Sequence, residues 1–148
     1  MGTEIFKNEI VIGSHYPEKV IPIIDQAKMS LDILMFDWRW YKNDISNPVQ
    51  LLNQAIVRAV RRGVKVRALT NYAELVELLR FLNVDAKLWP KKSLLHSKCL
   101  VIDKAITVMG SHNWTNNAFT SNYETSFIQC QNEVSEQMSK YFNDIWPL

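Results

Sequence analysis

Apolar residues along the chain alternate between strand-like and helix-like spacing. The segment "EIVIGS" (9–14) is short and β-branched, and apolar residues in "PEKVIPIIDQAK" (17–28) recur every three to four positions, as in a helix packed on one side. The apolar run "SLDILMFDW" (30–38) has the length of a buried strand. The pattern therefore predicts a strand, a helix and a second strand in this order.

The same alternation continues through the middle of the chain. Pro48 stands where a helix begins, and an apolar stripe follows it as far as Gly63. "VKVRALT" (64–70) predicts a strand, "YAELVELLRFLN" (72–83) a helix and "DAKLWP" (85–90) a short strand. This β-α-β rhythm predicts a sheet with helices packed on it.

The pattern changes after Pro90. "SLLHSKCLVID" (93–103) and "AITVMGS" (105–111) predict two strands joined by a tight turn. The rest of the chain predicts a polar loop, a strand and an amphipathic terminal helix, over residues 112–122, 123–130 and 132–146. We therefore expect one α/β domain spanning residues 1–148, with a mixed β-sheet flanked by helices on both faces.

Composition places the chain among soluble globular proteins. Its 148 residues are 47% hydrophobic and 22% charged, and its net charge of +2 is too small to indicate a nucleic-acid binder by itself. Cys99 and Cys130 form neither a CxxC pair nor a zinc spacing, which suits a reducing compartment or plain core positions. Without a signal sequence or an apolar run of membrane length, we expect a cytoplasmic protein with no stable membrane insertion.

The candidate chemistry lies in "LLHSKCLVID" and "GSHN". A strand places His96 and Lys98 on one face, where two cationic groups repel each other unless an anion lies between them. Ser111 and Asn113 point together from the neighbouring strand end, while Asp103 lies on the opposite side and is limited to a supporting role. An imidazole, an ammonium, a hydroxyl and a carboxamide can together hold a phosphate.

Other types of phosphate chemistry leave patterns that this sequence lacks. It contains no HxH, HExxH or DxD pattern, no P-loop and no GxGxxG. A histidine nitrogen can attack phosphorus directly, and a lysine can offset the charge on the phosphate oxygens. The sequence therefore predicts chemistry that uses no metal and no other cofactor.

These residues form a longer pattern. "HSKCLVID" followed by "KAITVMGSHN" gives His-x-Lys-(x)4-Asp-(x)6-Gly-Ser-x-Asn, which resembles the HKD signature of the phospholipase D superfamily. "ILMFDW" upstream and "NYE" downstream also look like the family's usual surroundings. The resemblance implies a phospholipase D-like fold, and the length is similar to that of the compact single-motif bacterial endonucleases of the family.

The resemblance implies catalytic roles for six residues, His96, Lys98, Asn113, Ser111, Glu124 and Asp103. His96 would form a phosphohistidine, Lys98 and Asn113 would hold the phosphate oxygens, and Ser111 would be a further donor. Glu124 resembles the family's downstream acidic residue, which hydrogen-bonds the histidine and fixes its tautomer.

The family's chemistry uses two histidines, whereas this chain contains the motif once. The resemblance therefore implies a homodimer whose two-fold axis runs through the active site. His15 is the other candidate acid if the protein works as a monomer. His112 alternates away from Ser111 and Asn113, so we expect it at the surface or behind the site.

Substrate contacts are predicted from position and residue type. Lys91 and Lys92 lie just before the strand of His96, and Trp38 follows a strand that points toward the site, where it could stack on bases or belong to a dimer interface. Arg58 and Arg62 belong to a basic run that could track a phosphate backbone or complement a helix end.

The function expected first is a metal-independent phosphodiesterase, an endonuclease acting on DNA or RNA. A phospholipase D or phosphatidyltransferase acting on phospholipid head groups is the alternative, and it would need an apolar surface for acyl chains. A non-catalytic phosphate-binding module is a third possibility, which the intact signature disfavours.

Overall fold

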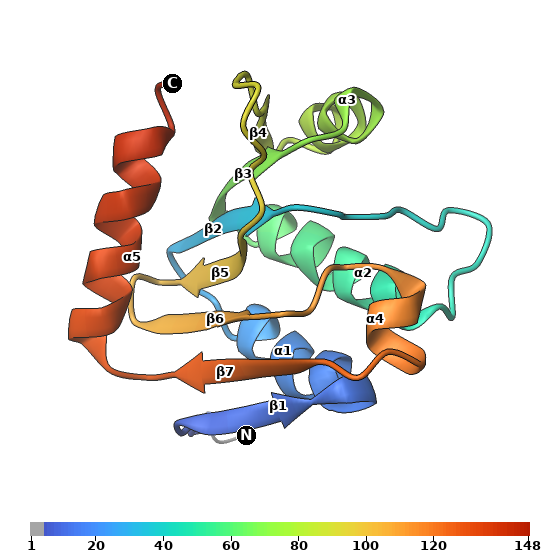
Figure 1. The fold of residues 1–148 in the computed structure, drawn as a ribbon, viewed down its shortest axis with the longest axis vertical. Coiled ribbons are helices and arrows are strands. Elements are labelled where there is room, and N and C mark those ends of the chain that lie inside the picture. The colour runs from blue at the N-terminus through green and yellow to red at the C-terminus, as the bar shows by residue number, and fades with distance from the viewer. Residues whose placement is uncertain (1–4) are drawn as a thin grey trace.

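The computed structural model describes residues 5–148 and contains a seven-stranded mixed sheet in the order β1-β7-β6-β5-β2-β3-β4 (Figure 1). The elements along the chain are β1 (Glu9–Ile12), η1 (Gly13–His15), α1 (Tyr16–Asp25), β2 (Ser30–Met35), α2 (Pro48–Arg61), β3 (Lys65–Thr70), α3 (Ala73–Phe81), β4 (Asp85–Leu88), β5 (Lys98–Ile102), β6 (Ile106–Gly110), α4 (Asn116–Thr120), β7 (Thr125–Gln129) and α5 (Asn132–Ile145). The predicted mixed α/β sheet is confirmed.

Strand direction follows from the connections. β2, β3 and β4 are parallel because α2 and α3 carry the chain back between them, whereas β5, β6, β7 and β1 each pair antiparallel with their neighbours. The helix α2 begins as predicted at Pro48, where the Asn47 side chain accepts a hydrogen bond from the backbone N–H of Val49 at 2.9 Å.

The sheet is covered by helices on both faces, as expected. One core joins α1, α2 and α3 to the sheet and includes Ile24, Ile33 and Ile56. The helix α5, red in Figure 1, packs on the other face through Phe142, against Cys99 and other residues. No helix within residues 5–148 is both long and apolar enough to cross a membrane.

A buried ion pair fastens α5 to the sheet. Asp32 is 2% exposed, and Arg67 donates to its two oxygens from Nε at 2.8 Å and from Nη2 at 3.1 Å. The same guanidinium lies 4.6 Å from the Phe142 ring centroid. Two parallel hydrogen bonds fix the Arg67 guanidinium in place. Because Phe142 of α5 packs on this guanidinium, the pair helps to hold α5 over the sheet.

Two local predictions were wrong. The strand predicted to begin near Ser93 begins at Lys98, because its partner β2 ends at Met35 and leaves only the Phe36 N–H to bond the Ser97 carbonyl. The expected polar loop contains a short helix, α4, whose first N–H groups are capped by Thr115. The irregular segment before Lys98 carries His96 out of the sheet.

Candidate active site

The sheet brings the signature residues other than Asp103 to one edge, where the ends of three strands meet. Lys98 begins β5 opposite Met35, the last residue of β2, and Cys99 pairs with Met109 near the end of β6. Antiparallel pairing therefore places the start of β5 beside the ends of β2 and β6. Residues as far apart in sequence as Asp37 and Asn113, 76 positions, meet there because these three strands are neighbours in the sheet.

His96 and Lys98 are in direct contact. Lys98 Nζ lies 3.1 Å from His96 Nδ1 and donates to the His96 carbonyl at 2.9 Å. Nζ also lies 3.4 Å from His96 Nε2, so the ammonium faces both ring nitrogens. Burial lowers the pKa of Lys98, and the nearby charge of Glu124 acts in the opposite direction.

Two residues that sequence reasoning missed hold His96 in place. The Phe36 ring lies 4.6 Å from the His96 ring, and Lys98 Nζ lies 5.3 Å from the Phe36 centroid. Asn71 uses its Nδ2 to donate to the carbonyls of both Phe36 and Leu95, each at 3.0 Å. Phe36 belongs to the quoted segment "ILMFDW", but nothing in the spacing of Asn71 relates it to the signature.

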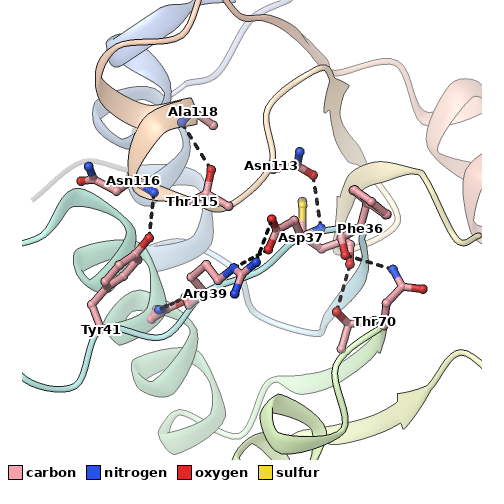
Figure 2. A network of polar contacts seen from close by, with 12 residues as sticks. Phe36, Asp37, Arg39, Tyr41, Thr70, Asn113, Thr115, Asn116 and Ala118 are labelled. Atoms are coloured by element: carbon pink, nitrogen blue, oxygen red, sulfur yellow. Dashed lines mark hydrogen bonds and ion pairs between the residues drawn. The ribbon is translucent and has the colours of Figure 1, made fainter.

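Asn113 has its donor group directed outward. Its Oδ1 accepts a hydrogen bond from the backbone N–H of Asp37 at 3.2 Å (Figure 2). Its Nδ2 has no partner within residues 5–148, so two N–H donors are available at this edge of the sheet.

Gly110 is required by the packing of β6 on β7. It pairs with Ser126, and a Cβ at this position would overlap the backbone of Thr125 and Ser126. This close approach lets the Ser111 N–H donate to the Thr125 carbonyl at 2.9 Å. The glycine of the signature therefore sets the position of the loop that carries Ser111 and Asn113.

Comparison with known proteins identifies the group to which this fold and site belong. The family of PLD-like domains described under cardiolipin synthase matches residues 20–146. The chain belongs to the phospholipase D-like family.

Relatives within the phospholipase D-like family have several names. The mitochondrial cardiolipin hydrolase of Homo sapiens is 30% identical over 126 residues, which cover 81% of this chain and 46% of that protein. A phospholipase D of Rickettsia conorii is 32% identical over 93 residues, covering 58% of this chain and 46% of that protein. The chain spans about half the length of these relatives.

Solved structures confirm the phospholipase D-like fold. Nuc from Salmonella typhimurium, a phospholipase D family member, superposes with a TM-score of 0.79 at 19% identity, covering 95% of each chain. NucT from Helicobacter pylori superposes with a TM-score of 0.71 at 23% identity, covering 97% of each chain. The predicted fold and family are both confirmed.

Ser111 and Glu124 of this phospholipase D-like chain interact differently from the expectation. The Ser111 hydroxyl donates to Glu124 Oε1 at 2.5 Å and accepts from the Thr125 N–H at 3.0 Å, so its one proton is not directed at a phosphate. Glu124 also accepts from Asn122 Nδ2 at 3.1 Å and makes no hydrogen bond to the His96 of its own chain. Ser111 therefore positions Glu124.

Asp103 lies at the far end of β5 from Lys98, in a turn where Asp103 and Lys104 both have a φ of 54°. Its carboxylate accepts hydrogen bonds from the backbone N–H groups of Lys28, Met29 and Ser30. At about 3.3 Å per residue, the length of β5 puts it roughly 16 Å from Lys98. Asp103 thus fixes the entry to β2 and contacts none of the other signature side chains.

The predicted substrate contact of Trp38 was wrong. Its side chain is 1% exposed, donates from Nε1 to Asn53 Oδ1 at 2.8 Å and meets the ring of Trp114 edge to face at 4.7 Å. A side chain enclosed in this way cannot stack on a base. Trp38 instead packs the loop after β2 against the loop that carries Asn113.

Arg58 and Arg62 bond to other parts of the chain. Arg58 pairs with Asp25 through two hydrogen bonds of 3.0 Å, and Arg62 donates to the carbonyls of Ile24 and Ala27. These partners precede β2, whereas the site lies beyond its other end. Both arginines join α2 to the end of α1, and their contact with a phosphate backbone stays a prediction.

The two predicted lysines and the other two histidines differ in their exposure to solvent. Lys91 and Lys92 are exposed in the segment that leads to His96. His15 is exposed and bonded to Glu18 at 2.7 Å. His112 is buried and lies behind the site, which is the second of the two positions expected for it.

The environment of His112 keeps its ring neutral. Nε2 donates to the Gly13 carbonyl at 2.9 Å, and Nδ1 lies 2.7 Å from the Ser126 hydroxyl, which can donate to it. Burial is the main cause that lowers the pKa of His112. Burial likewise raises the pKa of the Cys99 thiol to about 12, as expected of an inert core cysteine.

A pocket of about 450 Å³ opens beside the histidine. It is lined by His96, Ser97, Lys98, Cys99, Met109, Gly110, Met138 and Tyr141. One side therefore presents the signature residues, while α5 and β6 supply apolar and aromatic groups. Within residues 5–148 no group of three or more His, Cys, Asp or Glu side chains is placed to hold a metal ion.

Proposed function

We propose that this protein is a phosphodiesterase that hydrolyses nucleic acid through a covalent intermediate on His96 and needs no metal for this chemistry. The observation that carries the proposal is the direct contact between the His96 ring and the Lys98 ammonium, with Nζ 3.1 Å from Nδ1. The outward Nδ2 of Asn113 lies at the same edge of the sheet. A nucleophile and donors for phosphate oxygens are thus assembled together.

The proposed reaction has two displacements at phosphorus. A neutral ring nitrogen of His96 attacks, a P–N bond forms, and the P–O bond to the leaving group breaks as that oxygen gains a proton. Water then attacks phosphorus and breaks the P–N bond, and its proton passes to the group that protonated the leaving oxygen, which releases the phosphate monoester and the neutral histidine. Lys98 and Asn113 offset the negative charge that develops on the nonbridging oxygens in both steps.

The leaving oxygen needs an acid, and within residues 5–148 no second histidine lines the pocket beside His96. The chain has three histidines. His15 bonds Glu18, and His112 is enclosed by Gly13 and Ser126. This supports a homodimer in which the second His96 comes from the partner across a two-fold axis. A dimer would also give Glu124, which does not bond its own His96, a histidine to orient.

The substrate class is inferred from the surroundings of His96. Lys91 and Lys92 are exposed in the segment that precedes it, where they can follow a phosphate backbone. A phospholipid is the second candidate, because a relative is named a cardiolipin hydrolase and because Met109 and Tyr141, 42% and 47% exposed, line the pocket beside His96.

A substrate panel in excess chelator tests the proposal. We expect the wild type to cleave single-stranded DNA or RNA faster than cardiolipin vesicles, and His96→Gln to abolish cleavage. His15→Gln is the matched control, because His15 is an exposed histidine without a role in the reaction. Activity that requires a divalent ion, or that survives in His96→Gln, would contradict the mechanism. Cleavage of vesicles alone would establish the phospholipid alternative.

Mixing subunits tests the shared site. Wild-type chains are unfolded and refolded with an equal amount of His96→Gln chains, so that the subunits exchange. If both histidines are needed, activity per total chain falls to about a quarter, because only doubly wild-type dimers work. Independent sites would leave about half of the activity.

A further inference from the structure

A second cleft lies next to Asn113. It has a volume of about 580 Å³ and contains neither His96 nor Lys98. Three parts of the chain line it, namely the loop after β2, the loop before and into α4, and Asn122. The lining residues are Asp37, Arg39, Tyr41, Asn113, Thr115, Asn116, Asn117 and Asn122. Asn113 is therefore common to this cleft and the proposed phosphate site.

The walls of the cleft are fixed to each other by backbone hydrogen bonds. Trp114 N–H donates to the Asp37 carbonyl, and Arg39 N–H donates to the Trp114 carbonyl, both at 2.9 Å. The Tyr41 hydroxyl accepts from the Asn116 N–H at 2.9 Å (Figure 2). The cleft is thus formed in advance of any ligand, which lowers the entropy cost of binding.

The amide groups in the cleft present donors and acceptors together. Asn116 Oδ1 accepts from Asn47, which leaves its Nδ2 open, whereas Asn122 Nδ2 is bound to Glu124, which leaves its Oδ1 open. The side chain of Asn117 is exposed and has no partner within residues 5–148. Carboxamides that have open donors and acceptors match the paired acceptors and donors on the edge of a nucleobase.

Arg39 supplies the cation of the cleft. Its side chain is 52% exposed and pairs with Asp37 through Nε at 2.6 Å and Nη2 at 3.3 Å. Nη1 has no partner within the part of the chain that the structure describes. One face of the guanidinium lies over the Tyr72 ring, with 5.0 Å from Cζ to the centroid. The group is held in place yet keeps donors for a ligand.

We propose that this cleft binds the nucleoside attached to the scissile phosphate, with the amides of Asn116 and Asn117 on the base edge and Arg39 Nη1 on an oxygen of the base or sugar. The inference rests on the proposed nuclease function. An acyl chain does not fit this lining, because it would bury amides and a guanidinium without hydrogen-bond partners. The shared Asn113 places the nucleoside directly beside the phosphate.

The test compares phosphodiesters that share one leaving group. Thymidine 3′- and 5′-(p-nitrophenyl phosphate) carry the nucleoside, and methyl p-nitrophenyl phosphate does not. The nucleoside preference is the ratio of kcat/KM between the better thymidine ester and the methyl ester. We expect a preference of at least about tenfold in the wild type, which Asn117→Ala and Arg39→Ala each reduce by about tenfold.

Two variants separate the causes of a change. Arg61→Ala removes an exposed arginine at the end of α2 and should leave the preference unaltered. Arg39→Ala also leaves Asp37 without its cation, so the double variant with Asp37→Asn should recover any loss that arises from charge repulsion alone. A preference still reduced in the double variant identifies a lost contact with Arg39.

The outcomes distinguish the two proposals. A wild type that hydrolyses all three esters without a nucleoside preference, or a preference unchanged in Asn117→Ala and Arg39→Ala, overturns the cleft assignment alone. Hydrolysis by His96→Gln overturns the proposed mechanism, whatever the preference. A wild type that hydrolyses none of the three esters overturns both.

Discussion

Asn71 offers a demanding test of how the site is held together. Its single NH₂ group joins the carbonyl of Phe36, whose ring contacts His96, to the carbonyl of Leu95, the residue before His96. Asn71→Ala removes two hydrogen bonds of 3.0 Å. At about 0.5–1.5 kcal/mol each, the free energy of unfolding should fall by about 1–3 kcal/mol.

The same change should lower kcat, because the segment that carries His96 loses its tie to β3 and β2. A misplacement of about 1 Å can cost a factor of about 100 in rate. We expect kcat for methyl p-nitrophenyl phosphate to fall at least tenfold at a temperature where urea titration shows the variant fully folded. The kcat of Asn71→Asp, which keeps the shape of the side chain but removes the donor, should fall by the same factor.

Asn43→Ala is the matched control, since Asn43 lies in an exposed turn and forms no side-chain hydrogen bond within residues 5–148. It should leave both kcat and stability unchanged. If Asn71→Ala loses stability but its folded form keeps the wild-type kcat, Asn71 stabilises the fold without positioning His96, and the reasoning above is refuted.

Other residues give further predictions. Gly110→Ala should destabilise the fold by about 1–3 kcal/mol in chemical denaturation, because its Cβ overlaps the β7 backbone, and an unchanged midpoint would contradict that contact. The folded pKa of His112 lies below its ordinary 6.5, so the unfolded state gains the proton first as the pH falls. The free energy of unfolding should therefore decrease below pH 6.5, by at most about 1.4 kcal/mol per pH unit, and a His112→Gln variant that showed the same slope would refute this. Trp38→Phe should lower the free energy of unfolding, because it removes the hydrogen bond to Asn53. It should leave the nucleoside preference unaltered.

The order of strands and helices could be predicted from the sequence because each element carries its own period of apolar residues. The start of β5 could not be predicted from the sequence, because it depends on where its partner β2 ends. The pairing of the two strands stops at Met35 and Lys98. The burial of Trp38 could not be predicted from the sequence either. Its enclosure depends on Trp114, which lies 76 positions away in the chain and meets it through the isolated bridge between the two loops.

The site was predicted to the extent that its residues belong to one short pattern. His96, Lys98 and Asn113 are close in sequence and are brought to one edge by a hairpin. Asn71 follows a different strand, so only the tertiary structure relates it to His96. Arg58 and Arg62 are close in sequence, but their charge alone did not reveal that their partners lie on α1.

The most direct test of the central claim is the detection of the covalent intermediate. The wild type and His96→Gln are mixed with methyl p-nitrophenyl phosphate, quenched within the first turnover in alkaline denaturant and digested for mass spectrometry. We predict a methylphosphoryl group on the peptide that contains His96 in the wild type and none in His96→Gln. Release of p-nitrophenol by the wild type without any adduct on His96, or by His96→Gln at the wild-type rate, would contradict the mechanism.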